Sequence, residues 1–467
     1  MNGTDLLSLC RDVLAEAGEG EAEIYLRVAE RGCARFASGE LGQHMDLSEP
    51  VAVVRVARGR QVAETVTSRL DRASLVLAVR STALAARLVP EVDGFPGFAG
   101  DADAGNPPPQ NPPRFEQATA SATPDERVER LLPVLAAVRD AGLVSAGMLE
   151  TTCAAHALAT TRGCLRSHDA TVAAFRVWAL ETPGAGGAAG YGGAAHRDVR
   201  ALRLDEETAR AVRVCKASRD PASLDEGEYD VVLEPEAVAE LLEWLAAIAV
   251  GAPEVEQGTS ALAGRLGERI TGEGIDLVED PLDASELGFG VPFDREGTWR
   301  QRVPIVDRGV ARAILYDRTY AARAGKASTG SALLPAMGSA GGVGATAFSL
   351  GGGAAGSVDE LIAGIDRGLY VCRLHYVNGL VEPRRAVMTG LTRDGCFLVE
   401  KGKIGRPVGN LRFTDSLLEG LARCDGMTRD RKSIPTFWSD AGAVVAPAIR
   451  VRAFRFNGRS QQAPKLD

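Results

Sequence analysis

The sequence contains few of the residues that commonly build disulfide frameworks and metal sites. Its 467 residues include eight cysteines and five histidines. The cysteines are scattered and form no CxxC pair, which fits a reducing compartment better than a disulfide-bonded secreted protein. Residues 1–5 also lack the basic and apolar regions of a signal peptide. We therefore expect a cytoplasmic protein.

Long apolar runs and lysines are also scarce. The strongest apolar run, residues 244–250, is far shorter than the roughly 18 residues that a membrane-spanning helix needs. The net charge is −9 and there is no basic stripe. We therefore expect neither a membrane nor a nucleic acid as a partner. Only six of the 53 basic residues are lysines, and the chain is rich in alanine, glycine and valine, which indicates a GC-rich bacterial source.

No local motif reveals a catalytic centre. No two histidines are two to five residues apart and none lies in an HExxH frame, so neighbouring residues are not expected to form a zinc site. A GxSxG nucleophile motif is missing as well. The glycine-rich segment 338–356 lacks the GK[ST] ending of a phosphate-binding loop, and we interpret it as a mobile loop. The histidines are His44, His156, His168, His196 and His375.

The first half of the chain alternates helices and strands. Periodicity predicts a helix at about residues 4–17, short strands between residues 22 and 66, and a covering helix that Asp71 caps. A Pro-rich segment, residues 90–122, is interpreted as an exposed strap. After it, Thr123 can cap the next helix.

The same order of helix, strands and helix recurs between Thr123 and Lys216, with a glycine-rich patch at 184–193 before the last helix. This repetition leaves open whether the domain consists of two similar lobes. We place an N-terminal α+β domain, an antiparallel sheet with helices, at residues 1–225.

The second half of the chain is dominated by strands and turns. A short strand ends at Leu233, and a helix is expected over Pro235–Ala249. Its glutamates, Glu236, Glu240 and Glu243, are interpreted as the solvated side of a core helix. Beyond it the pattern predicts mostly short strands, so we expect residues 226–467 to form a β-rich domain of barrel or sandwich type. The predicted fold class is α+β.

Several segments of this half resemble the TldD/PmbA family, the modulator-of-gyrase proteins that are regarded as peptidases. The N-terminal half shows a weaker similarity to the same family at residues 22–26, 35–40 and 51–66. The resemblance therefore covers nearly the whole chain. The segments that carry the resemblance are residues 258–269 (GTSALAGRLGER), 292–297 (PFDREG), 314–318 (ILYDR), 328–330 (STG), 373–378 (RLHYVN), 389–395 (TGLTRDG), 400–408 (EKGKIGRPV) and 410–414 (NLRFT).

The resemblance implies a pair of related subunits. The TldD-type subunit carries HExxxH on a helix and a later cysteine that together hold zinc, and its glutamate activates the metal-bound water. In the present chain the aligned helix positions are Glu243, Trp244 and Ile248, and residues 431–440 contain no cysteine. The chain therefore resembles the PmbA/TldE-type subunit. The resemblance implies no cofactor in this chain and zinc in a TldD-type partner.

The implied activity is cleavage of unfolded, short or modified peptides, including leader peptides of natural products, by the heterodimer. The motifs make six residues candidates for the substrate cleft. One alternative is an independent peptide-binding or regulatory homodimer. Another is a diverged amide-hydrolysing enzyme of a biosynthetic pathway that uses scattered side chains. The cleft candidates are His375, Asn378, Arg393, Asp394, Thr329 and Gly330.

Overall fold

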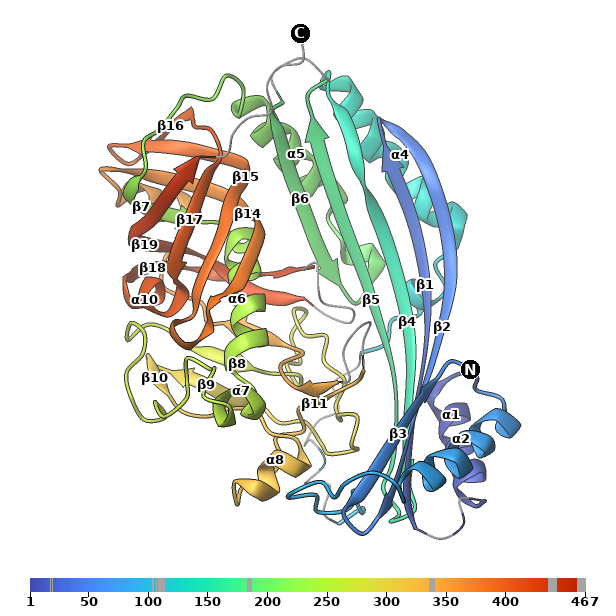
Figure 1. Ribbon diagram of the computed structural model, residues 1–467. Helices are drawn as coiled ribbons and strands as arrows, with labels where there is room; N and C mark the ends of the chain where they lie inside the picture. Colours follow the sequence, from blue (N-terminus) through green and yellow to red (C-terminus); the bar gives the residue numbers. More distant parts are fainter. Residues whose placement is uncertain are drawn as a thin grey trace.

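The computed structural model of the protein describes residues 1–16, 18, 20–102, 105, 107, 114–182, 187–335, 341–435 and 443–459. One antiparallel sheet organises the N-terminal half, and a larger mixed sheet organises the C-terminal half (Figure 1). The expected α+β class is therefore confirmed. Within these residues, no helix combines the length and the apolar character that crossing a bilayer requires.

The N-terminal sheet has six strands in the order β3-β2-β1-β4-β5-β6, and all its neighbours are antiparallel. Each lobe contributes three strands, and the lobes meet at β1 and β4, which pair from Glu23 opposite Thr160 to Phe36 opposite Gly147. The repeated order therefore produces one continuous sheet. The strands are β1 (Glu21–Ala37), β2 (Glu40–Arg58), β3 (Gln61–Thr67), β4 (Val144–Thr160), β5 (Leu165–Leu180) and β6 (Ala189–His196).

These strands are longer than the sequence predicts. The polar residues around Glu30 suggest an interruption, but β1 runs through them because it is paired on both edges there. The glycine-rich patch also becomes strand from Ala189, since Gly190 and Gly192 let α5 approach closely: a Cβ on either would lie within 2.3 Å of a backbone oxygen of that helix. Residues 183–186 lie outside the described residues.

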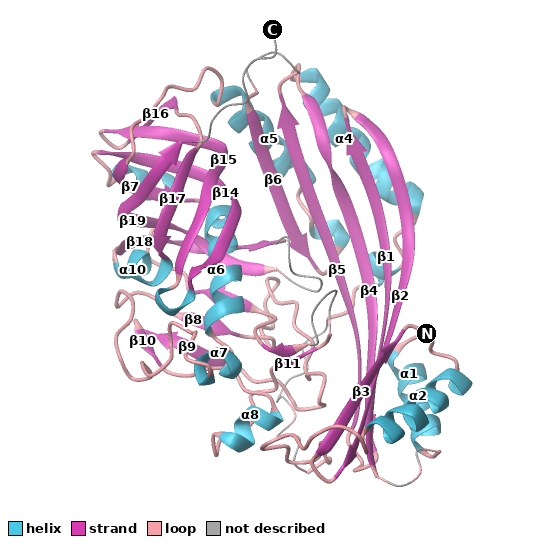
Figure 2. Ribbon diagram, viewed as in Figure 1, coloured by secondary structure: helices cyan, strands magenta, loops and turns pink. Residues whose placement is uncertain are grey.

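Helices cover the outer face of this sheet, with α1 and α2 at one end and α4 and α5 at the other (Figures 1 and 2). Capping boxes start two of them, through Asn2 with Asp5 in α1 and Thr123 with Glu126 in α4. Apolar residues of alternate strand positions, such as Leu26 and Phe175, pack beneath the helices. The helices are α1 (Gly3–Leu14), α2 (Arg72–Ala85), α3 (Gln117–Ala120), α4 (Pro124–Asp140), η1 (Val199–Ala201) and α5 (Leu204–Ala217).

Several described residues of the segment 90–122 are buried, contrary to the exposed strap that its composition suggests. Phe98 and Ala99 are fully buried, and Arg114 and Thr119 are 2% exposed. Side chains inside the segment anchor it to the rest of the protein. Arg114, for example, donates hydrogen bonds to three backbone carbonyls of the C-terminal half. Residues 103, 104, 106 and 108–113 lie outside the described part of the chain.

The C-terminal sheet contains eleven strands, with parallel pairs at β7–β14 and β13–β19 among antiparallel ones. Three strands are long, contrary to the expectation of mostly short strands: β14, β15 and β19 have 14 to 16 residues. The eleven strands are β7 (Gly227–Leu233), β8 (Leu277–Glu279), β9 (Val303–Asp307), β10 (Val310–Ala311), β13 (Phe348–Leu350), β14 (Arg367–Glu382), β15 (Val387–Glu400), β16 (Lys403–Pro407), β17 (Leu411–Ser416), β18 (Cys424–Ile434) and β19 (Val444–Arg459). A separate two-stranded sheet consists of β11 (Ala332–Leu333) and β12 (Gly342–Val343).

Short helices and one longer helix, α6, complete this half. The predicted boundaries of α6 are correct. The glycine-rich segment 338–356 contains strand residues of β12 and β13, and residues 336–340 lie outside the described residues. The helices are α6 (Pro235–Ala249), α7 (Ala252–Glu256), α8 (Arg318–Arg323), α9 (Val358–Ala363), η2 (Pro383–Arg385) and α10 (Leu417–Ala422).

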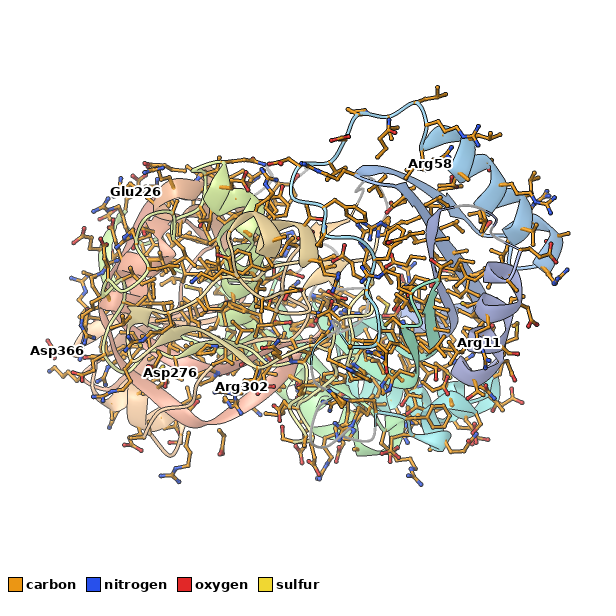
Figure 3. The ribbon with its side chains drawn as sticks, turned by 90° about the horizontal axis from the view of Figure 1, so that it is seen from below. Arg11, Arg58, Glu226, Asp276, Arg302 and Asp366 are labelled. Atoms are coloured by element: carbon orange, nitrogen blue, oxygen red, sulfur yellow. The ribbon has the colours of Figure 1, made fainter. Side chains whose placement is uncertain are left out.

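The C-terminal half lies against the inner face of the N-terminal sheet. Figure 3 shows the two layers side by side, with Arg11 and Arg58 on the N-terminal layer and Glu226 and Asp366 on the other. Buried ion pairs cross between the layers, such as Arg55 with Glu296 at 3.1 Å. The division into domains at residue 225 stays a prediction.

Candidate functional site

Helix α6 is the element on which the family resemblance places a metal site in related chains. It begins at Pro235, a residue suited to the first helical position, directly after β7. Val238, Leu241, Leu242 and Leu245 are buried in the main core of the C-terminal half. The helix is thus fixed by its apolar side and packs on β14 and β19, and its first turn contacts the N-terminal half through the pair of Glu236 with Arg210.

The positions aligned with the catalytic motif are filled by packing side chains. Trp244 and Ile248 lie against Gly379 of β14, where a Cβ would be 2.9 Å from Trp244 Cε3 and 3.2 Å from Ile248 Cδ1. Ile248 is buried, while Glu243 and Trp244 are half-buried. An indole and a butyl group offer no lone pair that zinc binds. The residues at these positions therefore do not fit a zinc site.

The rest of the described chain offers no replacement. No three histidine, cysteine, aspartate or glutamate side chains in that part come together to hold a metal. The eight cysteines are all free. Burial raises the pKa of Cys396 to about 12 and that of Cys424 to about 11, so neither thiol is a ready nucleophile near neutral pH. Residues 436–440 of the tail lie outside the described residues.

The first turn of α6 carries a buried ionic network, not a solvated face. Glu236 is 2% exposed and accepts hydrogen bonds from Arg210 at 3.2 Å and from Lys432 at 2.9 Å. Lys432 also pairs with Glu207 at 2.7 Å. The interpretation of Glu236 as solvated is wrong, because α5 and β18 bring two cations to it from distant parts of the sequence. The carboxylate of Glu234 accepts a hydrogen bond from the Tyr370 hydroxyl.

Next to this network, Asp394 joins the two sheets. It accepts hydrogen bonds from Arg373 at 2.7 Å and from the indole of Trp178, on β5, at 3.1 Å. The Arg373 guanidinium lies 4.5 Å from the centre of the Tyr191 ring. Asp394 is buried and has a φ of 52°, a left-handed conformation that aspartate tolerates better than most residues. Its carboxylate is thus held by two donors, and it suits a positioning role better than proton transfer.

The neighbouring candidates lie in the central part of the β14–β15 hairpin, where Arg373 is opposite Arg393 and His375 is opposite Leu391. Arg393 has half of its side chain exposed, and its Nε is 3.8 Å from Asp394. His375 is half-buried beside the exposed Tyr376. Burial and the charges of Arg393 and Arg373 lower the pKa of His375. Asn378 is exposed, and its side chain accepts the Leu380 N–H at 2.8 Å.

Thr329 and Gly330 lie in a separate turn. The Thr329 hydroxyl is 3.0 Å from the Tyr316 carbonyl and 2.8 Å from the Ser331 hydroxyl. Gly330 has a φ of 70°, and a Cβ there would be 2.7 Å from the Trp299 carbonyl oxygen. The geometry of the turn therefore accounts for the threonine at position 329 and for the glycine at position 330. Within the described residues, no hydrogen bond or ion pair joins them to the candidates on β14 and β15.

Glu240 is a residue that sequence reasoning assigned to solvent and that the structure places near the candidates. It follows Glu236 by four residues and precedes Trp244 by four, so the three share one face of α6. Burial raises the pKa of Glu240, although the charges of Arg373 and Arg176 oppose this rise. The spacing of four residues in the sequence indicates that these three side chains share a face of the helix. It does not indicate whether that face is exposed to solvent or packed against another part of the protein.

Comparisons with known proteins agree with this architecture. Residues 226–458 match the family described as the PmbA/TldA metallopeptidase C-terminal domain. A protein named "Metalloprotease" from Methanothermobacter thermautotrophicus is 30% identical over 250 residues, which cover 52% of this chain and 52% of that protein. The chain thus spans about half the length of this relative.

Two solved structures share the fold over nearly the full length of this chain. TldE from Thermococcus kodakarensis has a TM-score of 0.86 at 19% identity, with 97% of this chain and 99% of that chain covered. A putative modulator of DNA gyrase from Thermotoga maritima has a TM-score of 0.83 at 17% identity, with 96% and 99% covered. At these identities the likeness shows the fold.

Proposed function

Because this chain belongs to the TldD/PmbA family, we propose that it acts as a PmbA/TldE-type subunit that holds no catalytic metal and completes the peptide cleft of a TldD-type zinc metallopeptidase. The observation that carries the proposal is the packing of Trp244 and Ile248 against Gly379. By the resemblance, Trp244 stands where the catalytic subunit has its glutamate, and Ile248 stands where it has its second histidine ligand. In the heterodimer, the partner supplies the zinc and the activated water.

The substrates we propose are unfolded, short or modified peptides. The central part of the β14–β15 hairpin is the part of this chain that we assign to the cleft, with His375, Asn378 and Arg393 at its surface. Asp394 acts there as a positioning residue, because it fixes Arg373 against Trp178. The scattered free cysteines and the arginine-rich composition support a place in a bacterial cytoplasm.

The experiment is a measurement of metal content and peptidase activity for the chain alone and mixed with a TldD-type subunit from the same genome. We expect zinc and cleavage of an unstructured peptide only in the mixture. In the mixture, Arg393→Ala should raise KM for the peptide, whereas Glu226→Ala, an exposed residue outside the hairpin, should leave KM unchanged.

Stoichiometric zinc with turnover in the chain alone would refute the proposal and would favour the diverged amide hydrolase. A stable homodimer that binds peptides and never associates with the TldD-type subunit would instead support the independent binding module.

A further inference from the structure

Three basic side chains form a row across the inner face of the N-terminal sheet. Arg27 on β1 is directly opposite His156 on β4, and His156 is directly opposite His168 on β5. Directly opposite residues point to the same face, with Cβ atoms about 5 Å apart. Tyr25, two residues before Arg27, has its ring centre 6.3 Å from that of Phe293. The row therefore faces the C-terminal half.

The row has hydrogen-bonding capacity that the protein does not use. His156 is 5% exposed, and its Nδ1 is 2.8 Å from the Tyr25 hydroxyl. The Nε2 of His168 is buried and lacks a hydrogen-bond partner within the described residues. Buried polar atoms are normally paired, so the unpartnered Nε2 of His168, on the imidazole next to that of His156, requires an explanation.

Arg27 is the third member of the row. It is half-buried and makes neither a hydrogen bond nor an ion pair with any residue that the structure describes. A half-buried guanidinium without a carboxylate is uncommon, because Arg side chains that leave bulk water are usually paired.

The charges around the row are mainly positive. Burial, helped by the charges of Arg27, His168 and Arg300, keeps the pKa of His156 well below its usual value. Burial and Arg114 lower the pKa of His168 to about 4. Asp294 is the carboxylate whose charge contributes to the raised pKa of Tyr25, and it already accepts hydrogen bonds from the backbone N–H groups of Glu296, Thr298 and Ala332. The nearby carboxylate is therefore engaged elsewhere.

We propose that the row formed by Arg27, His156 and His168 binds an oxyanion, either the carboxylate of a peptide or a phosphate. The Arg27 guanidinium supplies the charge, and the imidazoles supply N–H donors. With the Tyr25 hydroxyl donating to Nδ1, the ring proton of His156 sits on Nε2, where an anion can accept it. The site goes beyond the proposed function and depends on neither a partner subunit nor zinc.

The test uses the full chain alone, labelled with nitrogen-15, and follows the side-chain signals of His156 and His168 by NMR at constant ionic strength. The probes are sodium acetate, inorganic phosphate, N-acetyl-alanyl-alanine and the amide of that dipeptide, with sodium chloride as the reference. An anion that accepts hydrogen bonds from the imidazoles stabilises their protonated forms. We expect a saturable change in both histidine signals and a rise in the pKa of His168 of about one unit.

Arg27→Gln should weaken binding at least about tenfold, because it removes the charge from the site. Arg35→Gln is the matched control, since Arg35 lies on the same strand and face eight residues away and is exposed. If Arg27→Gln does not fold, His168→Gln replaces it, with His156 as the reporter.

Binding of the free-acid dipeptide but not its amide would identify a peptide carboxylate as the ligand, and binding of phosphate without the dipeptide would identify free phosphate. No response to any of the probes would overturn the proposal. An equal loss of binding in Arg35→Gln would also overturn it, because the effect would then be one of net charge.

Discussion

Glu236 is among the most deeply buried charges of the chain, and two cations from different parts of the sequence balance it. Arg210 comes from α5 and Lys432 from β18. Charges in the interior are costly unless they are paired and hydrogen-bonded. Here the pairing also connects the N-terminal half to α6, so a single residue contributes both to local charge balance and to the position of the candidate site.

Replacing Glu236 should destabilise the protein. Glu236→Ala leaves Arg210 and Lys432 with an excess of positive charge in the interior, and loss of one member of a buried pair costs about 3 kcal/mol. The free energy of unfolding from urea denaturation measures this loss. Glu226→Ala, at an exposed site, should change it by less than about 0.5 kcal/mol. Equal effects of the two variants would contradict the importance of the network.

The same variant should change the response to acid. Burial raises the pKa of Glu236, but Arg210 and Lys432 outweigh burial, so the pKa is lowered overall. The stability that this carboxylate contributes is present above its ordinary pKa of about 4.3 and is lost as the pH falls through the lowered value. Glu236→Ala should therefore lose less stability than the native chain on acidification below about pH 4.

At the scale of elements, the contact between α6 and β14 places the candidate site. Gly379 allows the strand to lie directly on Trp244 and Ile248. The glycine at this strand position thus leaves the space that the two large side chains of the helix occupy.

Gly379→Ala should push the helix away from the strand. The new Cβ would lie 2.9 Å from Trp244, and overpacking of this kind costs about 1–3 kcal/mol. Differential scanning calorimetry would show a lower Tm. The matched control is Gly42→Ala in β2, where a Cβ has no neighbour within 4 Å. An unchanged Tm for Gly379→Ala would mean that the helix and strand are not closely packed.

At the scale of the whole molecule, the two halves are joined by polar contacts far apart along the N-terminal sheet. Arg55 pairs with Glu296 near one end, and Trp178 binds Asp394 near the other. Between them, Arg114 donates to the carbonyls of Pro281, Gly288 and Gly290 at 3.1–3.3 Å. The relative position of the halves therefore rests on several independent anchors.

Arg114→Met should loosen the loop at residues 281–290. The substitution keeps an unbranched apolar stem but leaves three carbonyls without their donor, at a cost of about 1–3 kcal/mol for each buried group. Hydrogen exchange should rise in this loop and stay unchanged in α1. Arg302→Met, which removes a surface ion pair to Asp280 near the same loop, serves as the control. If hydrogen exchange in the loop at residues 281–290 is the same in the two variants, Arg114 does not anchor this loop.

The sequence by itself determined the features that depend on neighbouring residues. The bounds of α6 follow from helical periodicity and from Pro235, the cap of α4 follows from Thr123 and Glu126, and the missing HExxxH motif can be read directly. The family follows from short motifs in order along the chain. These signals are local, so no tertiary contact is needed to interpret them.

Only the tertiary structure decided which distant residues meet. His156 and His168 look scattered in the sequence, yet strand register places them side by side with Arg27, more than 120 positions away. Glu236 looks solvated until α5 and β18 cover it. The physical reason is that burial and pairing depend on packing between segments, and periodicity shows only which residues of one segment share a face.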